Sequence, residues 1–161
     1  MAVTNQCGGL EIDVQVASSC ESVPSPKSLR TWVRCALGNR LRGALTVRIV
    51  DEPEGAELNE RYRRVPGATN VLAFLAGESV PPPTDELPLV GDLVICAPVL
   101  EREARAQGKS LEAHWAHISI HGALHLLGFD HGHDEETRVM EAREIELLES
   151  LGFAASHISD G

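Results

Sequence analysis

The sequence predicts an α+β fold, in which one mixed β-sheet carries helices packed on it. Strand and helix patterns are mixed along the chain without strict β–α–β alternation. A chain of 161 residues, 43% hydrophobic and 24% charged, suits a single domain with its own core. We expect one domain over residues 1–161, with mobile ends at 1–8 and 155–161 and a Pro-rich loop at 77–88.

Two strands and two helices are expected in the first part of the chain. Residues 10–17 alternate apolar and polar side chains, as a half-buried strand does. Ser25 and Pro26 then open a helix, and residues 44–50 form a second strand. Acidic residues at 51 and 52 begin another helix, where the helix dipole favours negative charge. The apolar face of the first helix consists of Leu29, Trp32, Val33 and Leu37.

The rest of the chain predicts two more strands and three helices. Residues 70–75 form a short strand, and residues 91–96 are apolar enough for an inner strand of the sheet. Three helices follow: one from Pro98 to Gln107, one over 110–127, and one that is capped by Asp134 and ends before Gly152.

The charge distribution limits the kinds of ligand that fit. The net charge of −10 argues against a protein that coats nucleic acid without specificity. Residues 1–64 carry nine Lys and Arg against eight Asp and Glu, whereas residues 65–161 carry five against sixteen. An anionic ligand would therefore meet the first part more easily. No secretory signal is visible and the four cysteines form no CxxC pair, so we expect a cytoplasmic protein with reduced thiols.

The strongest functional signal is a cluster of histidines, since six of the seven lie between positions 114 and 133. His121 and His125 are one helical turn apart on one face, and Gly128 can end that helix and return His131 as a third ligand. Three neutral nitrogen ligands with an open fourth position are typical of a catalytic zinc site. The alternative is a set of unrelated histidines on the surface or in the core.

The spacing matches the zinc motif of metzincin proteases at the metal-binding positions and departs from it at Gly122. That motif carries a glutamate there as the general base. We therefore expect no metzincin-like peptidase activity. Asp130 is a candidate proton acceptor, and its alternative role is to orient the ring of a ligand histidine. His117 is either a fourth ligand or a polar neighbour in the cleft, and we expect His114 at the cleft rim or in solvent and His133 exposed.

These residues carry a resemblance to the YbeY family of bacterial rRNA maturation factors. The matching blocks are HGALHLLGFDH at 121–131 with His117 before it, LNxxYR at 58–63 followed by TNVLAF at 69–74, GDLVI at 91–95, and MExxE at 140–144. The resemblance implies His121, His125 and His131 as ligands of one Zn²⁺ per chain, and Arg63 as a cleft arginine important for activity. Ala73 and Cys96 depart from it, because the family commonly has serine at both positions.

The chemistry of Arg63 also supports a role in the site independently of the resemblance, because a guanidinium suits bidentate contact with phosphate. The alternative is a surface ion pair with Glu60 or another acid. Arg63, His117 and Asp130 are therefore the candidate catalytic residues. Four aromatic side chains are either base-stacking platforms or, as we favour, core residues: Trp32, Phe74, Trp115 and Phe129.

The function that the resemblance implies is a zinc-dependent, single-strand endoribonuclease. It would act in rRNA maturation, at the 3′ end of 16S rRNA, and in ribosome assembly and quality control. Its implied partners are rRNA of the small-subunit precursor, a small-subunit ribosomal protein and an assembly GTPase, with no membrane. Two alternatives stay open: a non-catalytic, zinc-stabilised ribosome assembly factor, and a metal-dependent hydrolase of another bond.

Overall fold

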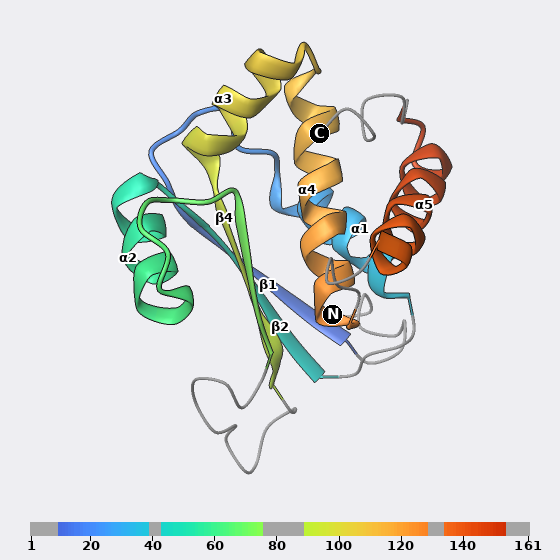
Figure 1. The fold of residues 1–161 in the computed structure, drawn as a ribbon, viewed down its shortest axis with the longest axis horizontal. Helices are drawn as coiled ribbons and strands as arrows, with labels where there is room; N and C mark the ends of the chain where they lie inside the picture. The colour runs from blue at the N-terminus through green and yellow to red at the C-terminus, as the bar shows by residue number, and fades with distance from the viewer. Residues whose placement is uncertain (1–9, 39–42, 76–88, 129–133, 154–161) are drawn as a thin grey trace.

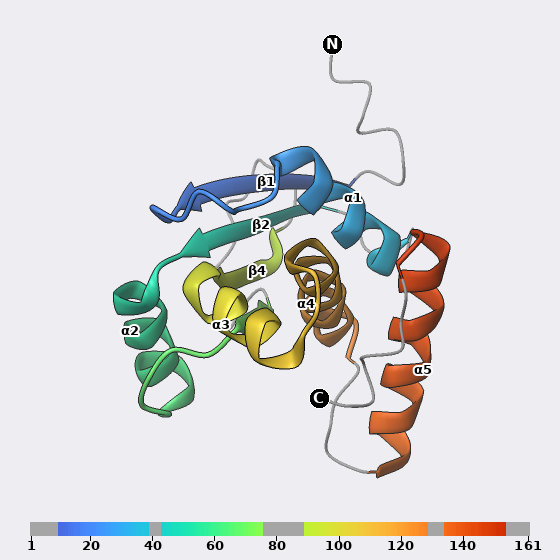
Figure 2. The same cartoon turned by 90° about the horizontal axis from the view of Figure 1, so that it is seen from above.

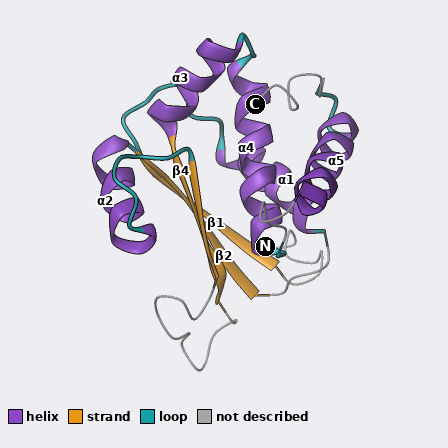
Figure 3. Ribbon diagram, in the orientation of Figure 1, coloured by secondary structure: helices purple, strands orange, loops and turns teal. Residues whose placement is uncertain are grey.

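The computed structural model describes residues 10–38, 43–75, 89–128 and 134–153. The two ends that we expected to be mobile and the Pro-rich loop lie outside these ranges. So do Phe129, Asp130, His131 and His133. Figures 1 and 3 show the elements. In chain order they are β1 (Leu10–Ala17), α1 (Pro26–Leu37), β2 (Gly43–Val50), α2 (Glu52–Arg63), β3 (Val71–Leu75), β4 (Leu89–Cys96), α3 (Ala97–Gln107), α4 (Leu111–Leu126) and α5 (Asp134–Ser150).

The four strands form one mixed sheet in the order β1-β2-β4-β3. Strands β1, β2 and β4 run parallel, and β3 pairs with β4 in the antiparallel sense at the edge of the sheet. The expected α+β class with a single mixed sheet is confirmed. The two-residue alternation of strand side chains then sends the apolar residues of β3 and β4 to two separate cores.

The larger core lies between the sheet and helices α1 and α4. It contains Leu45 and Val47 from β2 and Leu93 and Ile95 from β4, all fully buried. The alternate residues of β3 and β4 form a smaller apolar cluster on the α2 side, together with Val50 of β2 and Val99 of α3. Its strand residues from β3 and β4 are Leu72, Phe74, Val94 and Cys96. Figure 2 shows α4 in the middle, surrounded by the sheet, α1, α3 and α5, while α2 stands apart from it. Our expectation that Trp32, Phe74 and Trp115 are core residues is confirmed.

Helix α4 begins and ends where the sequence predicts. The side chain of Ser110 caps its first turn by accepting a hydrogen bond from the amide of Ala113, at 3.1 Å. Gly128 follows its end with a φ of +102°, in the region that favours glycine, as expected for a chain reversal. Among the described helices, none is long and apolar enough to cross a membrane.

Candidate active site

His121 and His125 line a cleft of about 480 Å³ at the C-terminal end of α4, beside the edge strand β3. Arg63, at the end of α2, lines the same cleft. The remaining lining residues come from β3 and its start and from the end of α4: Asn70, Val71, Leu72, Ala73, Leu75, Leu126 and Gly128. The fold therefore brings Arg63, a candidate anion-binding side chain, to the two candidate ligands His121 and His125. Both ligands lie 58 or more positions after Arg63 in the sequence.

The two histidines have the geometry of ligands to one ion. Their Nε2 atoms lie 3.2 Å apart. Two nitrogens that bind one tetrahedral Zn²⁺ at about 2.0–2.1 Å are separated by about 3.3 Å. The donor set of neutral imidazoles also suits zinc. The described part of this site therefore fits a zinc ion, and His131, the expected third ligand, and Asp130 lie outside the described residues.

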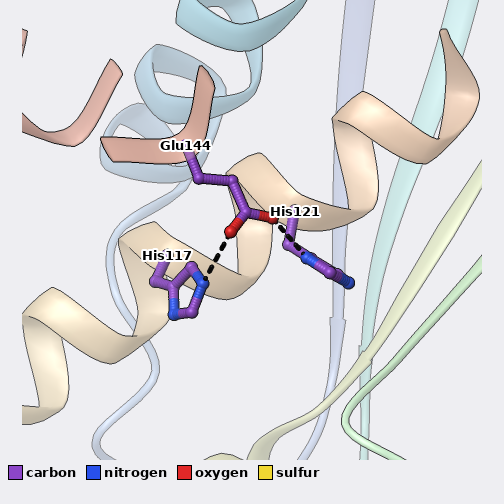
Figure 4. Close-up of side chains that lie close together, drawn as sticks. All are labelled: His117, His121 and Glu144. Atoms are coloured by element: carbon purple, nitrogen blue, oxygen red, sulfur yellow. Dashed lines mark hydrogen bonds and ion pairs between the residues drawn. The ribbon is translucent and has the colours of Figure 1, made fainter. Parts of the chain in front are cut away.

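A buried carboxylate, that of Glu144, lies between His117 and His121 (Figure 4). Glu144 of α5 is only 2% exposed, and its Oε2 lies 2.5 Å from Nδ1 of His121. Its other oxygen, Oε1, lies 3.2 Å from Nε2 of His117, one turn earlier on α4. A carboxylate that accepts from the far nitrogen of a ligand histidine is a common support in metal sites, because it fixes the ring and its tautomer.

Burial and hydrogen bonding act in opposite directions on Glu144. Burial alone would raise the pKa of this carboxyl, but the hydrogen bonds from His117 and His121 outweigh it and lower the pKa from 4.5 to about 2. Burial lowers the pKa of His117, against the opposing effect of the hydrogen bond to Glu144. At neutral pH the site therefore holds a charged carboxylate between imidazoles, of which His117 is neutral.

His117, His121 and Glu144 also form a group that could hold a metal ion, since one ligand atom from each lies within 4.8 Å of the others. The contact between Glu144 Oε2 and His121 Nδ1 is too short for both atoms to bind one ion, because zinc ligands about 2 Å from the metal stand more than 3 Å apart. We therefore interpret the contact between Glu144 and His121 as a hydrogen bond, and the Nε2 atoms of His121 and His125 as the candidate metal ligands.

Arg63 contacts the edge strand. Its Nη2 donates to the backbone carbonyl of Ala73 at 2.5 Å, and its guanidinium carbon lies 5.1 Å from the ring centroid of Phe74. Among the described side chains it forms no ion pair, so the alternative of a surface pair with Glu60 finds no support. The side chain is exposed, and the cation–π contact with Phe74 holds it beside the cleft.

The expectation about His114 needs correction, and the structure separates the two departures from the family. His114 is 2% exposed, neither at the rim nor in solvent, because its Nε2 is paired with Glu103 Oε1 at 2.8 Å between α3 and α4. Cys96 is buried under α2 and is not among the residues that line the cleft, so the serine that it replaces would have been buried as well. Ala73, in contrast, does line the cleft.

Sequence reasoning noted Glu144 as part of a motif and gave it no role. A signal was available, because Glu144 shares one face of its helix with Met140, Leu147 and Leu148, which are all buried. A glutamate on an apolar helix face must find a partner or lose its charge. The side chains of His117 and His121 are those partners.

Comparison with known proteins identifies the family of this chain. The family model described as Endoribonuclease YbeY matches residues 18–152. Endoribonuclease YbeY of Pseudomonas syringae pv. syringae (strain B728a) is 54% identical over 154 residues, covering 94% of this chain and 90% of that protein. The protein of that name from Pseudomonas entomophila (strain L48) is 52% identical over 152 residues, covering 94% and 95%.

A solved structure shares the fold. The solution structure of TM1509 from Thermotoga maritima matches with a TM-score of 0.55 and 25% identity, over 86% of this chain and 88% of that one. The family model spans β2, α2 and β3 as well as the histidine helix, so the match includes both walls of the cleft. With more than half of its sequence identical to that of a curated relative over nearly the whole length of both, this chain belongs to the endoribonuclease YbeY family.

Proposed function

We propose that this protein is a zinc-dependent endoribonuclease that cleaves single-stranded regions of rRNA. The observation that carries the proposal is the cleft itself, which is lined by a pair of imidazole nitrogens 3.2 Å apart and by an exposed arginine. His121, His125 and His131 would hold one Zn²⁺ per chain. The family name supports cleavage of RNA, and the donor set supports zinc.

The bound metal would polarise a phosphate oxygen or lower the pKa of a bound water. Arg63 would bind the phosphate that enters the cleft and stabilise the charge that develops on it, because its two parallel donors match two phosphate oxygens. The cleft has a volume of only about 480 Å³, which favours a single RNA strand whose nucleotides can be splayed over a helical duplex as the substrate. Asp130 would take the proton or orient His131.

The place of this activity in the cell follows from the family resemblance. The substrate would be precursor rRNA of the small subunit, at the 3′ end of 16S rRNA, in the cytoplasm. A small-subunit ribosomal protein and an assembly GTPase would be partners, and the net charge of −10 favours partners with basic surfaces. The same charge is what favours the second candidate, a zinc-stabilised assembly factor that does not cut RNA.

Single-turnover cleavage of a labelled single-stranded RNA separates these two functions. The purified wild-type protein should cleave, and a His121→Ala variant purified in parallel should not, because the variant removes one metal ligand and leaves any contaminating ribonuclease in place. Equal cleavage by both proteins would refute the enzyme assignment. Zinc bound at one equivalent without cleavage by the wild type would favour the assembly factor.

A further inference from the structure

A chain of polar side chains runs from the turn between α3 and α4 to the metal-facing histidines, and it begins at Lys109. The ammonium nitrogen of Lys109 lies 3.4 Å from Nδ1 of His117 and 3.5 Å from Nδ1 of His114. An ammonium group has three donors and no acceptor. An N–H on either Nδ1 would meet a positive charge, so the lone pair of each ring is favoured at Nδ1.

The position of the lone pair on His117 determines which of its nitrogens carries the proton. A neutral imidazole carries one N–H, and with Nδ1 as the acceptor that N–H is on Nε2. Nε2 of His117 lies 3.2 Å from Oε1 of Glu144, and can therefore donate to it. The side chain of His117 is 14% exposed, and each of its ring nitrogens has a polar partner, Lys109 Nζ at Nδ1 and Glu144 Oε1 at Nε2.

Glu144 in turn determines which nitrogen of His121 carries the proton. With Oε1 occupied by His117, the carboxylate presents Oε2 to Nδ1 of His121 at 2.5 Å, so the N–H of His121 is on Nδ1. Its Nε2 then carries the lone pair, and this is the atom that lies 3.2 Å from Nε2 of His125 in the cleft. Because Glu144 is 2% exposed, water has little access to replace either imidazole partner.

A second set of contacts, through His114, Glu103 and Asn70, also involves Lys109. Nε2 of His114 pairs with Oε1 of Glu103 at 2.8 Å, and both oxygens of Glu103 lie 3.3 Å from Nδ2 of Asn70. Asn70 lies directly before β3 and lines the same cleft as Arg63 and His125. The polar chain thus connects both walls of the cleft through α3, α4 and α5.

We propose that Lys109 and His117 are positioning residues, which act through Glu144 to hold His121 in the Nδ1–H tautomer, with the Nε2 lone pair facing the cleft. The proposal rests on the proposed function only in taking that lone pair as a metal ligand. It also assigns His117 a role through Glu144 in place of ligation or proton transfer to the substrate. Loss of such supporting partners typically weakens metal binding about 10–100-fold.

The tautomers can be observed directly by ¹⁵N NMR of the histidine rings in the metal-free wild-type protein at neutral pH. We expect an N–H on Nε2 of His117 and on Nδ1 of His121. In Lys109→Met, which keeps the length of the side chain but removes its donors, this preference of the His117 ring should weaken, because only Glu144 then favours the N–H on Nε2. Lys27→Met, an exposed lysine on α1, is the matched control and should leave both rings unchanged. An N–H on Nε2 of metal-free His121 in the wild type would overturn the proposal.

Zinc affinity, measured by competition with a chelator, gives the second readout. His117→Leu removes both the donor and the acceptor and should weaken zinc binding about 10–100-fold. His117→Gln keeps one donor for Glu144 and one acceptor for Lys109, and should recover most of the affinity. Equal zinc affinity in the wild type and His117→Leu would overturn the proposal. A wild type with the expected tautomers and tight zinc binding that cleaves no RNA would refute the proposed function and leave this inference intact.

Discussion

Arg63 is held beside the cleft by contacts that do not involve the candidate ligands. Its guanidinium touches the Ala73 carbonyl and the face of Phe74, so a change of its head group should leave the fold and the zinc site in place. Arg63→Glu inverts the charge that a phosphate meets and should abolish RNA cleavage. Arg63→Lys should retain only part of the rate, because a point charge lacks the paired donors of the guanidinium.

The experiment measures cleavage rate, zinc content and thermal midpoint for both Arg63 variants. Zinc content and midpoint should stay near the wild-type values. Wild-type cleavage by Arg63→Glu would make Arg63 an ordinary surface residue, whereas loss of zinc or of folding would make its role structural. Arg61→Glu, on the same helix but outside the lining of the cleft, is a suitable control for the change in net charge.

Asp92 is a titratable carboxyl that lies outside the cleft of His121 and His125. It lies on β4 in a second hollow, on the α2 side of the sheet, and burial raises the pKa of its carboxyl above the usual 3.8. The folded state therefore favours the protonated form more than the unfolded state does. The resulting loss of stability is absent below the unfolded pKa and develops as the pH rises through the folded pKa.

Replacing this carboxyl with an amide should remove that loss. Asp92→Asn should raise the free energy of unfolding at pH 7 by a small amount, of the order of 0.5 kcal/mol. The gain should shrink as the pH falls toward 4. Urea unfolding across this range measures it, with Asp13→Asn on the exposed face of β1 as the control. A gain that is independent of pH, or a loss at pH 7, would contradict the assignment of the burial effect.

At the scale of the element, α4 can lie close to the sheet because position 122 is a glycine. A Cβ built on Gly122 would come within 2.9 Å of Val71 Cγ2 and 3.0 Å of Leu93 Cδ2. Position 122 therefore faces the sheet, where a glutamate would lie among apolar side chains. The packing of α4 against the sheet therefore explains why position 122 cannot carry the glutamate that serves as general base in the metzincin motif.

Gly122→Ala should accordingly destabilise the protein, although alanine favours a helix over glycine by about 1 kcal/mol. Overpacking of a tight interface costs about 1–3 kcal/mol, which exceeds that gain. Chemical unfolding should show a net loss, and Gly122→Glu should lose far more and show no zinc-dependent proteolysis of unfolded casein. A stabilised Gly122→Ala variant would mean that α4 and the sheet shift apart at little cost.

The boundaries of the elements show what local sequence rules capture. The capping serines, the prolines in the first turns and Gly108 and Gly128 fix the helix ends, and the structure agrees with the sequence within a residue or two. The closeness of His121 and His125 was also predictable, because i and i+4 on one helix is a local relation. Glu144 and Lys109 were not, since their roles depend on which face of α5 and which turn pack against α4.

At the scale of the whole molecule, the candidate site joins parts of the chain that the metal would hold together. His121 and His125 are on the central helix, and Glu144 ties that helix to α5. A ligand that binds the folded state alone adds stability in proportion to the logarithm of its concentration over Kd. Zinc binding should therefore stabilise the entire fold, and not only the end of α4.

Zinc at 100 times its Kd should add about 2.7 kcal/mol to the free energy of unfolding. For a chain of this size the thermal midpoint should rise by roughly 5–10 °C. The His121→Ala/His125→Ala double variant should bind no stoichiometric zinc and show no such rise, because both described ligands are gone. His157→Ala, a histidine outside the motif, should respond like the wild type. Full zinc occupancy in the double variant would show that the metal is held elsewhere, and the ligand assignment would then be wrong.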